Sequence, residues 1–564
     1  MSIDATTFDE DSPILTPIPA NAAGGKPMRP ARARADAAWQ AIDRFLIRAG
    51  DWLNPILVKE TRQALKSSQF AITFVLVLVL CWIVTIGVVA YIGPRIFYSA
   101  DGGTLLAWYL GVLSLPLMVV VPLAAFRSLT AEREDNTYDL LSITSLKPRQ
   151  IISGKLGSSV AQMAVYFSAI TPCLAFTYLL RGVDLPTIAV LLVSWFFWSL
   201  GLSMVGILLA TLTPQKFVQV VILVAFVAGL FVMLYAAVLL GIGASYYGRS
   251  VIGGSGNEFW IITGVVATAY VTFFALAFFA SAGLITFTSD NRSTPLRICM
   301  LVQQAAFIGW IAVAWISENF DQEGVFALAV VAAIYWYTMG TLLTAEKPGM
   351  SQRVRRRLPQ SFSGRMFFSW LNPGPSTGYV FVIANATSIA VICSIGTAIS
   401  SVYSTRSGGW LSVDSMLMLL IVGWGYLVAY LGVGLLLVGA LRRIATVTML
   451  ASVLIHLLLL LAGFGVPYAM KSMSIELREA DYTLLQISDP FYSLAHVAYN
   501  GASGDAGVIA LVVPGVALCV LLLNMPGIIR ELQIVREAAP ARVIQDEAEL
   551  HPPPVEVPQN PWEE

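Results

Sequence analysis

Long apolar stretches, separated by short polar ones, constrain this chain more than any other feature of its sequence. A helix needs about 20 apolar residues to cross the hydrocarbon core of a bilayer, and twelve stretches meet that requirement. The backbone finds no water inside a bilayer, so each crossing must satisfy its own hydrogen bonds as a helix. The sequence therefore predicts an all-α polytopic membrane protein with about twelve transmembrane helices. The predicted spans are 70–93, 105–126, 156–180, 185–212, 217–242, 259–287, 298–316, 325–343, 379–402, 411–441, 444–470 and 508–529.

The overall composition agrees with a membrane protein. Hydrophobic residues make up 57% of the chain and charged residues 12%, whereas an ordinary soluble domain carries about 25% charged residues. The formal net charge is zero, so bulk charge gives no indication of a nucleic-acid partner. All five cysteines lie inside or at the edge of apolar stretches, which argues against a disulfide framework or a cysteine metal site. These cysteines are Cys81, Cys173, Cys299, Cys393 and Cys519.

Lys and Arg residues concentrate in alternate loops between the predicted spans. If the N-terminus is cytoplasmic, 28 of the 34 Lys and Arg residues fall on the cytoplasmic side. Cytoplasmic loops of membrane proteins carry such an excess of positive charge. We therefore expect a multi-pass protein of the cell (inner) membrane with cytoplasmic N- and C-termini. The first span begins near Phe70, too late for a cleavable signal, so it is expected to act as the insertion signal.

Composition divides the chain into five regions. Residues 1–38 are expected to form a disordered cytoplasmic tail, because they lack an apolar period. Residues 39–69 are expected to form interfacial amphipathic helices, and the second of these, at 56–68, carries a polar face of Lys59, Glu60, Arg62 and Lys66. Two six-span regions follow at 70–290 and 291–531. Residues 532–564 form an acidic, Pro-rich cytoplasmic tail, which is predicted to be disordered from Pro540.

The longest charged interruption in the first half of the chain is the polar stretch at residues 127–155. Charged residues gather at 132–135, and a short apolar face follows between residues 140 and 146. The Lys-Pro-Arg sequence at 147–149 interrupts the pattern before a new helix leads through Gly154 and Lys155 into the third span. A charged turn followed by a short amphipathic helix is typical of a surface that docks a cytosolic partner.

The polar stretch resembles the cytoplasmic coupling region of type-2 ABC exporter permeases, the membrane subunits of ATP-binding-cassette transporters. That family typically has Glu-Arg-Glu, a Thr three residues on, a Leu-Leu pair, a run containing Pro-Arg, and then Gly-Lys. The sequence departs from the pattern at Asn136, Ser145 and Gln150, where the family most often has Gly, Pro and Glu. The matching residues are Glu132, Arg133, Glu134, Thr137, Leu140, Leu141, Thr144, Leu146, Pro148, Arg149, Ile151, Gly154 and Lys155.

The resemblance implies a permease subunit that couples ATP hydrolysis by a separate cytosolic ATPase subunit to the export of a substrate. It also implies that two permeases pair, as a homodimer or a heterodimer. ATP would be bound by the partner subunit, because this chain has no Gly-x-x-x-x-Gly-Lys-Ser/Thr motif. The residues that the resemblance assigns to ATPase coupling are Glu132, Arg133, Glu134, Thr137, Leu140, Leu141, Gly154 and Lys155.

Motifs for catalysis or metal binding are missing from the sequence, so we expect no enzyme activity, cofactor site or metal site in this chain. It contains no His-Glu-x-x-His, no zinc-spaced cysteine pair and no Gly-x-Ser-x-Gly. His456 lies within a span, where it is either a functional group or a neutral imidazole bonded between helices. The other intramembrane polar groups either line a route or bind helices together, and they are Gln162, Gln219, Gln303, Gln304, Asn385 and Asn524.

Alternative interpretations remain open for several features. An ion-gradient-driven secondary transporter is one alternative function, although such proteins usually place carboxylates near mid-membrane and the predicted spans lack them. A non-transporting scaffold that recruits a cytosolic protein is another. The most basic loop, between Ala345 and Trp370, either anchors the topology or binds anionic lipid headgroups or an acidic partner. The sequence Trp-Leu-Asn-Pro at 52–55 recurs at 370–373, through internal duplication or chance.

Overall fold

Helices form all the regular secondary structure that the computed structural model describes, and twelve of them are long and apolar enough to cross a membrane. The predicted all-α polytopic fold with twelve spans is therefore confirmed. The expected N-terminal tail, at 1–38, and the interfacial helix expected near 39–53 lie outside the described residues. The described residues are 54–94, 102–134, 146–212, 215–251, 256–287, 289–317, 322–356, 358–359, 361, 363–364, 368–403, 412–473, 482–501, 504–534, 536 and 540–550.

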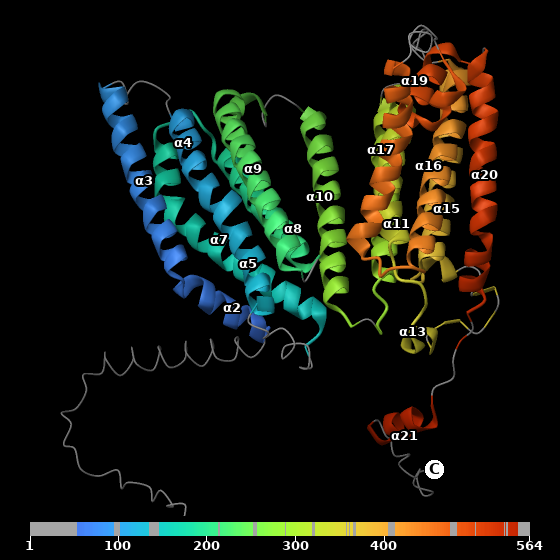
Figure 1. Cartoon of the computed structure of the whole chain (residues 1–564). Helices are drawn as coiled ribbons and strands as arrows, with labels where there is room; N and C mark the ends of the chain where they lie inside the picture. Colours follow the sequence, from blue (N-terminus) through green and yellow to red (C-terminus); the bar gives the residue numbers. More distant parts are fainter. Residues whose placement is uncertain are drawn as a thin grey trace, which may run out of the picture.

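The first six spans pack around one central helix, α4. α4 contacts α3, α7 and α9, and its continuation α5 packs on α8 (Figure 1). Tyr109, Leu113 and Met163 are fully buried between these helices. The helices of this group are α2 (Pro55–Lys66), α3 (Ser68–Ile92), α4 (Gly102–Leu115), the π-helical η2 (Pro116–Val120), α5 (Val121–Glu134), α7 (Pro148–Leu179), α8 (Leu185–Thr211), α9 (Lys216–Val251) and α10 (Gly256–Ile285).

The last six spans form a second group, in which α16 contacts α12, α15, α17, α19 and α20. Glycines bring these helices close together, because a Cβ atom at Gly432 would lie 2.5 Å from both Val520 Cγ1 and the Tyr379 hydroxyl. The helices of this group are α11 (Thr294–Ser317), α12 (Gln322–Thr344), α13 (Gln352–Arg356), η3 (Ser369–Leu371), α15 (Pro375–Tyr403), α16 (Val413–Leu441), α17 (Met449–Met473), η4 (Leu484–Ser488), α19 (Pro490–Asn500) and α20 (Asp505–Leu532).

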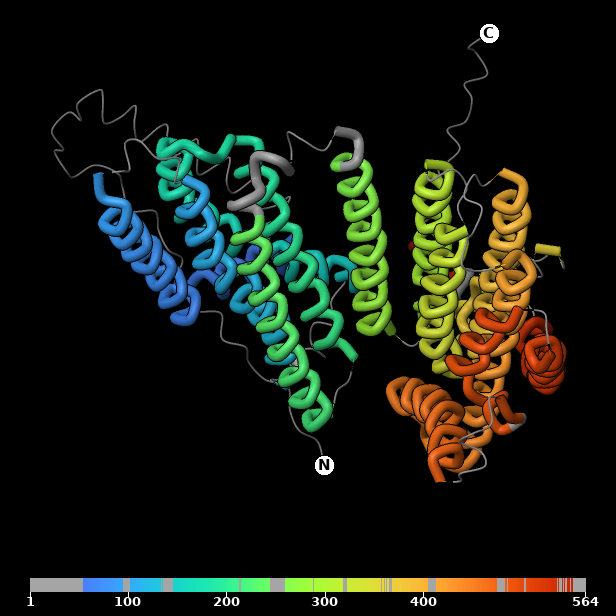
Figure 2. The backbone as a smooth tube through the Cα atoms, turned by 90° about the horizontal axis from the view of Figure 1, so that it is seen from above, coloured from blue at the N-terminus to red at the C-terminus, as the bar shows by residue number. Residues whose placement is uncertain are grey.

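The two groups meet where α10 packs on α11. The Phe273 and Phe307 rings lie 6.5 Å apart across this contact, and Trp310 covers Gly264. The view from above shows the first group on one side of α10 and the second group on the other (Figure 2). The two groups are therefore adjoining bundles joined through one pair of neighbouring helices.

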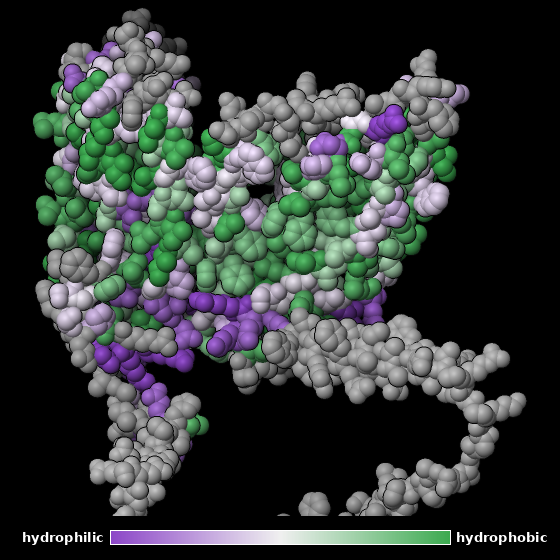
Figure 3. All heavy atoms as spheres, turned by 180° about the vertical axis from the view of Figure 1, so that it is seen from behind, coloured by the Kyte–Doolittle hydropathy of each residue, from purple (hydrophilic) through white to green (hydrophobic). Residues whose placement is uncertain are grey.

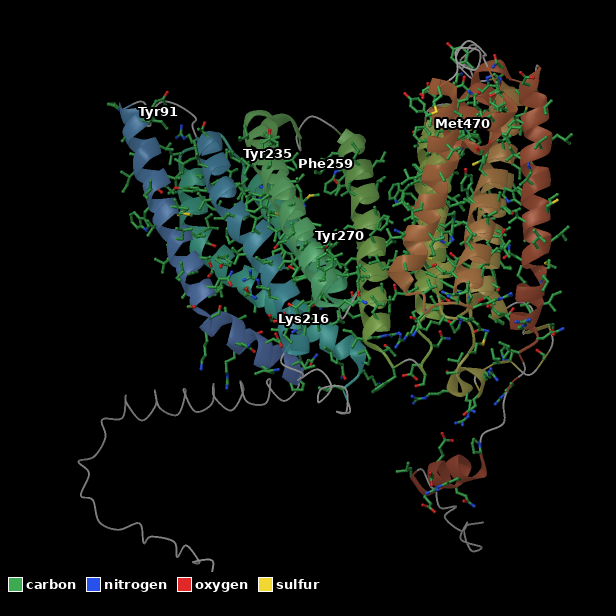
Figure 4. The ribbon with its side chains drawn as sticks, in the orientation of Figure 1. Tyr91, Lys216, Tyr235, Phe259, Tyr270 and Met470 are labelled. Atoms are coloured by element: carbon green, nitrogen blue, oxygen red, sulfur yellow. The ribbon has the colours of Figure 1, made fainter. Side chains whose placement is uncertain are left out.

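The outer surface has the composition that a bilayer requires. Exposed apolar side chains cover the middle of the molecule, and hydrophilic ones gather along its lower edge (Figure 3). Tyr91 lies at the upper end of α3 and Lys216 at the lower end of α9, near the two edges of this apolar band (Figure 4). α2 and α13 lie at the lower end of the bundles and α19 at the upper end (Figure 1).

The structure differs from the sequence-based expectation at several helix boundaries and in the C-terminal tail. The second span was expected to end at Phe126, but α5 continues to Glu134, because Leu129 in its polar end is fully buried. The eleventh span begins at Met449, five residues later than expected, after a turn near Arg443. α21 (Ala541–Leu550) lies in the tail that was predicted to be disordered, and that prediction is wrong for these residues. Its Ala, Arg, Gln, Glu and Leu residues favour a helix.

Candidate functional site

The two ends of the polar stretch lie next to each other in space. Glu132 lies near the end of α5, and Lys155 lies two turns into α7. The Lys155 Nζ atom is 3.0 Å from Glu132 Oε2, and it donates a hydrogen bond of 3.1 Å to the carbonyl oxygen of Ser128. The helices before and after the polar stretch are therefore joined by an ion pair and a hydrogen bond.

Glu60 of α2 completes a charged cluster around Lys155. Its Oε1 atom accepts a hydrogen bond of 3.1 Å from Lys155 Nζ. The Lys155 side chain is 0% exposed, while those of Glu60 and Glu132 are 8% and 12% exposed. Lys59 lies at the rim, 58% exposed and 3.5 Å from Glu132 Oε1. We name Glu60, Glu132 and Lys155 the basal cluster.

Two glycines of α7 allow α2 to approach closely. A Cβ atom at Gly154 would lie 2.8 Å from Ile56 Cγ2 and 3.1 Å from the backbone nitrogen of Leu57. A Cβ atom at Gly157 would lie 2.5 Å from Leu57 Cδ1. Close helix pairs in membrane proteins use small residues in this way, because they let the backbones come together. The approach brings Glu60 within reach of Lys155.

The starting residues of α2 and α7 are also linked. Asn54 Oδ1 accepts a hydrogen bond of 3.1 Å from the Ile56 amide, and Asn54 Nδ2 donates to the Gln150 carbonyl oxygen. Gln150 Oε1 accepts one of 2.9 Å from the Lys147 amide. Gln150 therefore caps α7 at a position where the resembling family most often has Glu. These bonds satisfy polar groups that a helix start leaves without intrahelical partners.

The charges of the basal cluster depend on one another. Moving an ion out of water costs free energy, so buried charges persist when they are paired. Burial raises the pKa of Glu60 above its ordinary value of 4.5, whereas the neighbouring Lys155 ammonium group lowers it. Lys155 therefore favours the ionised form of Glu60, against the effect of burial.

The structure divides the expected coupling residues into internal and external ones. Lys155 is buried and Gly154 lies beneath Ile56, so both act within the fold. Glu132 is paired inside the cluster, while Glu134 is exposed at the end of α5. Arg133 is part of α5, and nothing further is described of its side chain. Thr137, Leu140 and Leu141, with the coupling helix expected there, lie outside the described residues.

The sequence alone does not identify Glu60 as a member of the site. Its neighbours predict a polar face on α2, yet Ile56 and Glu60 both lie on the face that is buried against α7. Their four-residue spacing puts them one above the other on a helix. An acidic residue at helical spacing from a buried Ile is the signal that could have shown a buried carboxylate.

A π-helical segment lies between the basal cluster and the centre of the first group. η2 begins at Pro116, and Leu117 and Met118 within it are fully buried. Ser199 of α8 donates a hydrogen bond of 2.6 Å to the Leu117 carbonyl oxygen. Segments of this kind interrupt α-helices and often occur at functional sites. The second span is therefore one long helix with an internal irregularity above its polar end.

A second buried charge cluster lies in the other group of spans. Arg297, counted by sequence with a cytoplasmic loop, is fully buried in α11. Its guanidinium group lies 2.9 Å from Glu346 Oε2 and donates a 3.1 Å hydrogen bond to the Gly374 carbonyl oxygen. Glu531 of α20 accepts a hydrogen bond of 2.8 Å from the Thr377 amide at the start of α15. These contacts tie α11, α12, α15 and α20 together at their lower ends.

Most of the other intramembrane polar groups join helices. His456 Nε2 lies 3.2 Å from Thr344 Oγ1 of α12, which agrees with an imidazole bonded between helices. Asn524 of α20 donates a hydrogen bond of 3.2 Å to the Gly432 carbonyl oxygen of α16. In the described part of the chain, no three His, Cys, Asp or Glu side chains come together in a way that could hold a metal ion.

Comparisons with known proteins add no further assignment. No family model matches the chain, and neither a curated protein nor a solved structure matches it. The basal cluster, its place at one end of the first group and the resemblance of the polar stretch are therefore the observations from which a function is argued.

Proposed function

We propose that this chain is the membrane-spanning permease subunit of an ATP-driven exporter of the type-2 ABC class. The basal cluster is the observation that carries the proposal. It joins Glu132 and Lys155, which belong to the stretch resembling the family's coupling region, to Glu60 of α2. In the proposal, a separate cytosolic ATPase subunit docks beside this cluster and binds the ATP. Two permeases pair above the ATPases, as the resemblance implies.

The contacts of the basal cluster favour a mechanical role. Glu134 is exposed at the end of α5, where basic groups of an ATPase would meet it. A displacement there would move α4 as well, because α5 continues through η2 into α4. Lys155 would carry the same displacement to α7 and to α2, since it binds groups on both α5 and α2. The three helices would then tilt together and open the route outward.

Docking and transmission fall on different residues in this proposal. Glu134, Thr137, Leu140 and Leu141 would contact the ATPase, with the leucines filling an apolar cleft in it. Lys155, Glu132 and Glu60 are too buried to do so, and they would instead keep α2, α5 and α7 in a fixed arrangement. η2 would allow α4 to bend relative to α5, because helices bend where their regular hydrogen bonding is interrupted.

The decisive experiment is to purify the tagged full chain from its native host in mild detergent and to identify the soluble subunits that accompany it. We expect a subunit with a Walker A motif, and we expect its loss when residues 131–145 are scrambled. Scrambling 541–550, which forms α21 elsewhere in the chain, is the matched control and should leave the complex intact. A cytosolic partner without ATPase activity would favour the scaffold, and gradient-driven transport without ATP would favour the secondary transporter.

A single substitution tests the docking role of Glu134. Glu134→Lys should weaken binding of the ATPase by at least about tenfold, because a charge pair at a rim of this kind would become a repulsion. Glu549→Lys, at another exposed Glu near a helix end, should leave the affinity unchanged. The affinity of each variant for the ATPase is measured with the purified subunits. Unchanged affinity for Glu134→Lys would show that this residue is not part of the proposed docking surface.

A further inference from the structure

The second group of spans contains an apolar cavity that the proposed function leaves unused. The cavity measures about 420 Å³ and lies between α12, α15, α16 and α19. Its lining contains no charged side chain, and it includes Trp336, Leu420, Leu427 and Ala498. Pockets that bind small molecules typically measure about 300–1,000 Å³ and have mostly apolar linings. Size and lining therefore both suit a small apolar ligand.

Two polar atoms, one in the lining of this cavity and one at a smaller cavity next to it, lack hydrogen-bond partners among the described residues. They are Trp336 Nε1 and Gln304 Oε1, and Gln303 Nε2 on the same helix as Gln304 lacks a partner as well. Trp336 is 1% exposed and lines the cavity, and it also lines a smaller cavity of about 10 Å³, which Gln304 borders. A buried polar group without a partner is costly in apolar surroundings, and a bound molecule can supply the missing partner.

Other polar groups near these atoms have hydrogen-bond partners. Trp424 Nε1, also from the lining, donates a hydrogen bond of 2.9 Å to Thr387 Oγ1. The Tyr335 hydroxyl donates to Gln303 Oε1 at 2.9 Å, and Gln304 Nε2 donates to Ser388 Oγ at 3.1 Å. Each glutamine is thus held at one end of its amide, while the other end has no partner.

The cavity opens toward the bilayer along α12, and its lining also includes Tyr499 of α19, which is 94% exposed. Val330, which is part of the lining, is 41% exposed on α12, whose neighbouring surface residue Ile334 is 65% exposed. Both residues lie within a candidate span, so lipid surrounds this surface. An ionised headgroup inside the cavity would meet no opposite charge, and its burial would be very costly. The ligand is therefore expected to be neutral and to arrive from the membrane.

We propose that this cavity binds a neutral lipid that has a long apolar chain and a carbonyl group. The chain fills the space between α12, α15, α16 and α19, and the carbonyl oxygen accepts a hydrogen bond from Trp336 Nε1. The site rests on the second group of spans alone. It does not depend on ATP coupling, and its failure would leave the association with an ATPase untouched.

The test uses the full chain in nanodiscs and a palmitoyl methyl ester that carries a diazirine and an alkyne in its acyl chain. After illumination, peptides from α12, α16 and α19 that line the cavity should carry the label. Ala329→Trp fills the cavity and should reduce this labelling at least tenfold. Ile334→Trp, on the same helix but outside the lining, is the matched control and should leave it unchanged.

Trp336→Phe tests the hydrogen bond separately from the fit. It should raise the ester concentration for half-maximal labelling about three- to tenfold, the effect of losing one neutral hydrogen bond. A probe with the same chain but no carbonyl group should bind the wild-type protein and the Trp336→Phe variant equally. Equal ester binding by Trp336→Phe would overturn the contact.

Labelling spread evenly over the lipid-facing surface, or unaffected by Ala329→Trp, would overturn the cavity as a site. Gel filtration and circular dichroism check each variant, and Ala333→Trp, also in the lining, replaces Ala329→Trp if the latter fails to fold.

Discussion

Lys155 of α7 is the residue that joins three helices at the base of the first group of spans, α2, α5 and α7. It is buried, and its one ammonium group contacts a carboxylate of α2, a carboxylate of α5 and a carbonyl oxygen of α5. A buried charge cluster is not a large net source of stability, because desolvation offsets much of the attraction. Removing Lys155 takes away the ammonium group that both carboxylates share, and the loss of a buried partner is strongly destabilising.

Lys155→Met should therefore lower the free energy of unfolding by about 3–5 kcal/mol, because Glu60 and Glu132 lose the buried ammonium group that they share. Glu60→Gln should cost less, about 1 kcal/mol, since a neutral amide avoids the desolvation of a carboxylate. Denaturation in mild detergent measures both values. Lys59→Met, at the exposed rim, is the control and should cost less than about 1 kcal/mol. Equal losses for Lys155→Met and Lys59→Met would contradict the central role of Lys155.

The pKa of Glu60 gives the cluster a pH dependence whose sign is defined. Burial raises this pKa in the folded protein above 4.5, so the folded state holds the proton more tightly than the unfolded state does. The contribution of Glu60 to stability is then largest below pH 4.5 and falls as the pH rises through its folded-state pKa. As the pH rises through this range, the unfolding temperature of Glu60→Gln should therefore increase relative to that of the wild type. A difference that is constant with pH would show that Glu60 keeps its ordinary pKa.

The residues of the basal cluster were only partly predictable from the sequence. Glu132 and Lys155 stand out through the resemblance of the polar stretch, but their mutual contact does not follow from it. Glu60 belongs to a different helix, 95 residues before Lys155 in the chain. A periodic pattern tells which residues share a helix face, but it does not tell which helix covers that face. Long-range partners of this kind had to come from the structure.

Among the helices, the contact between α2 and α7 decides where the basal cluster lies. Their separation is set by Gly154 and Gly157, over which Ile56 and Leu57 lie. α2 is short, with 12 residues, and its own hydrogen bonds would make it marginal in water. Packing against α7 therefore contributes most of its stability.

Gly154→Val should displace α2 and lower the free energy of unfolding by about 1–3 kcal/mol, because its Cβ atom would clash with Ile56 and with the backbone of Leu57. Gly111→Val in α4, where nothing lies within 4 Å of the new Cβ atom, should change stability by less than about 1 kcal/mol. The same denaturation assay compares them. A neutral Gly154→Val would mean that α2 does not pack tightly on α7.

The helices themselves were the most predictable level of the structure. The span expected at 185–212 matches α8, because Pro186 at its start and the apolar run after it act together. The end of the second span was missed, since hydropathy falls at Arg127 although the helix continues to Glu134. The thickness of the membrane limits the length of an apolar run, but it does not limit the length of a helix that packs on other helices beyond the membrane.

For the whole molecule, the sequence predicted the number of spans and a division into six-span regions at 70–290 and 291–531, but not which helices pack on one another. Each group has its own buried clusters, one around Tyr109 and Met163 and another around Tyr379 and Leu431. Which side chains pack across the contact between α10 and α11 does not follow from the sequence, because apolar residues that face lipid and those that face another helix look alike. The packing of the spans had to be read from their contacts.

The arrangement makes a prediction about sidedness. α5 and α13 end on the same side of the apolar band, and α19 lies on the other (Figure 1). In a chain from which the five native cysteines are removed, Glu134→Cys and Arg353→Cys should react with an impermeant maleimide only in inside-out vesicles. Tyr499→Cys, at a position 94% exposed, should react only in right-side-out vesicles. Labelling of all three from one side would exclude the predicted orientation.

The contact between Glu60 and Lys155 also has a consequence for biosynthesis. Glu60 leaves the ribosome 95 residues before its partner does, and two spans are made in between. Until the third span arrives, the carboxylate of α2 must stay in contact with water or headgroups, because no cation is there to accompany it inward. α2 therefore waits at the membrane surface while α3 and α4 insert. Synthesis of α7 then closes the base of the first group, so the first helix that the structure describes is among the last to be packed.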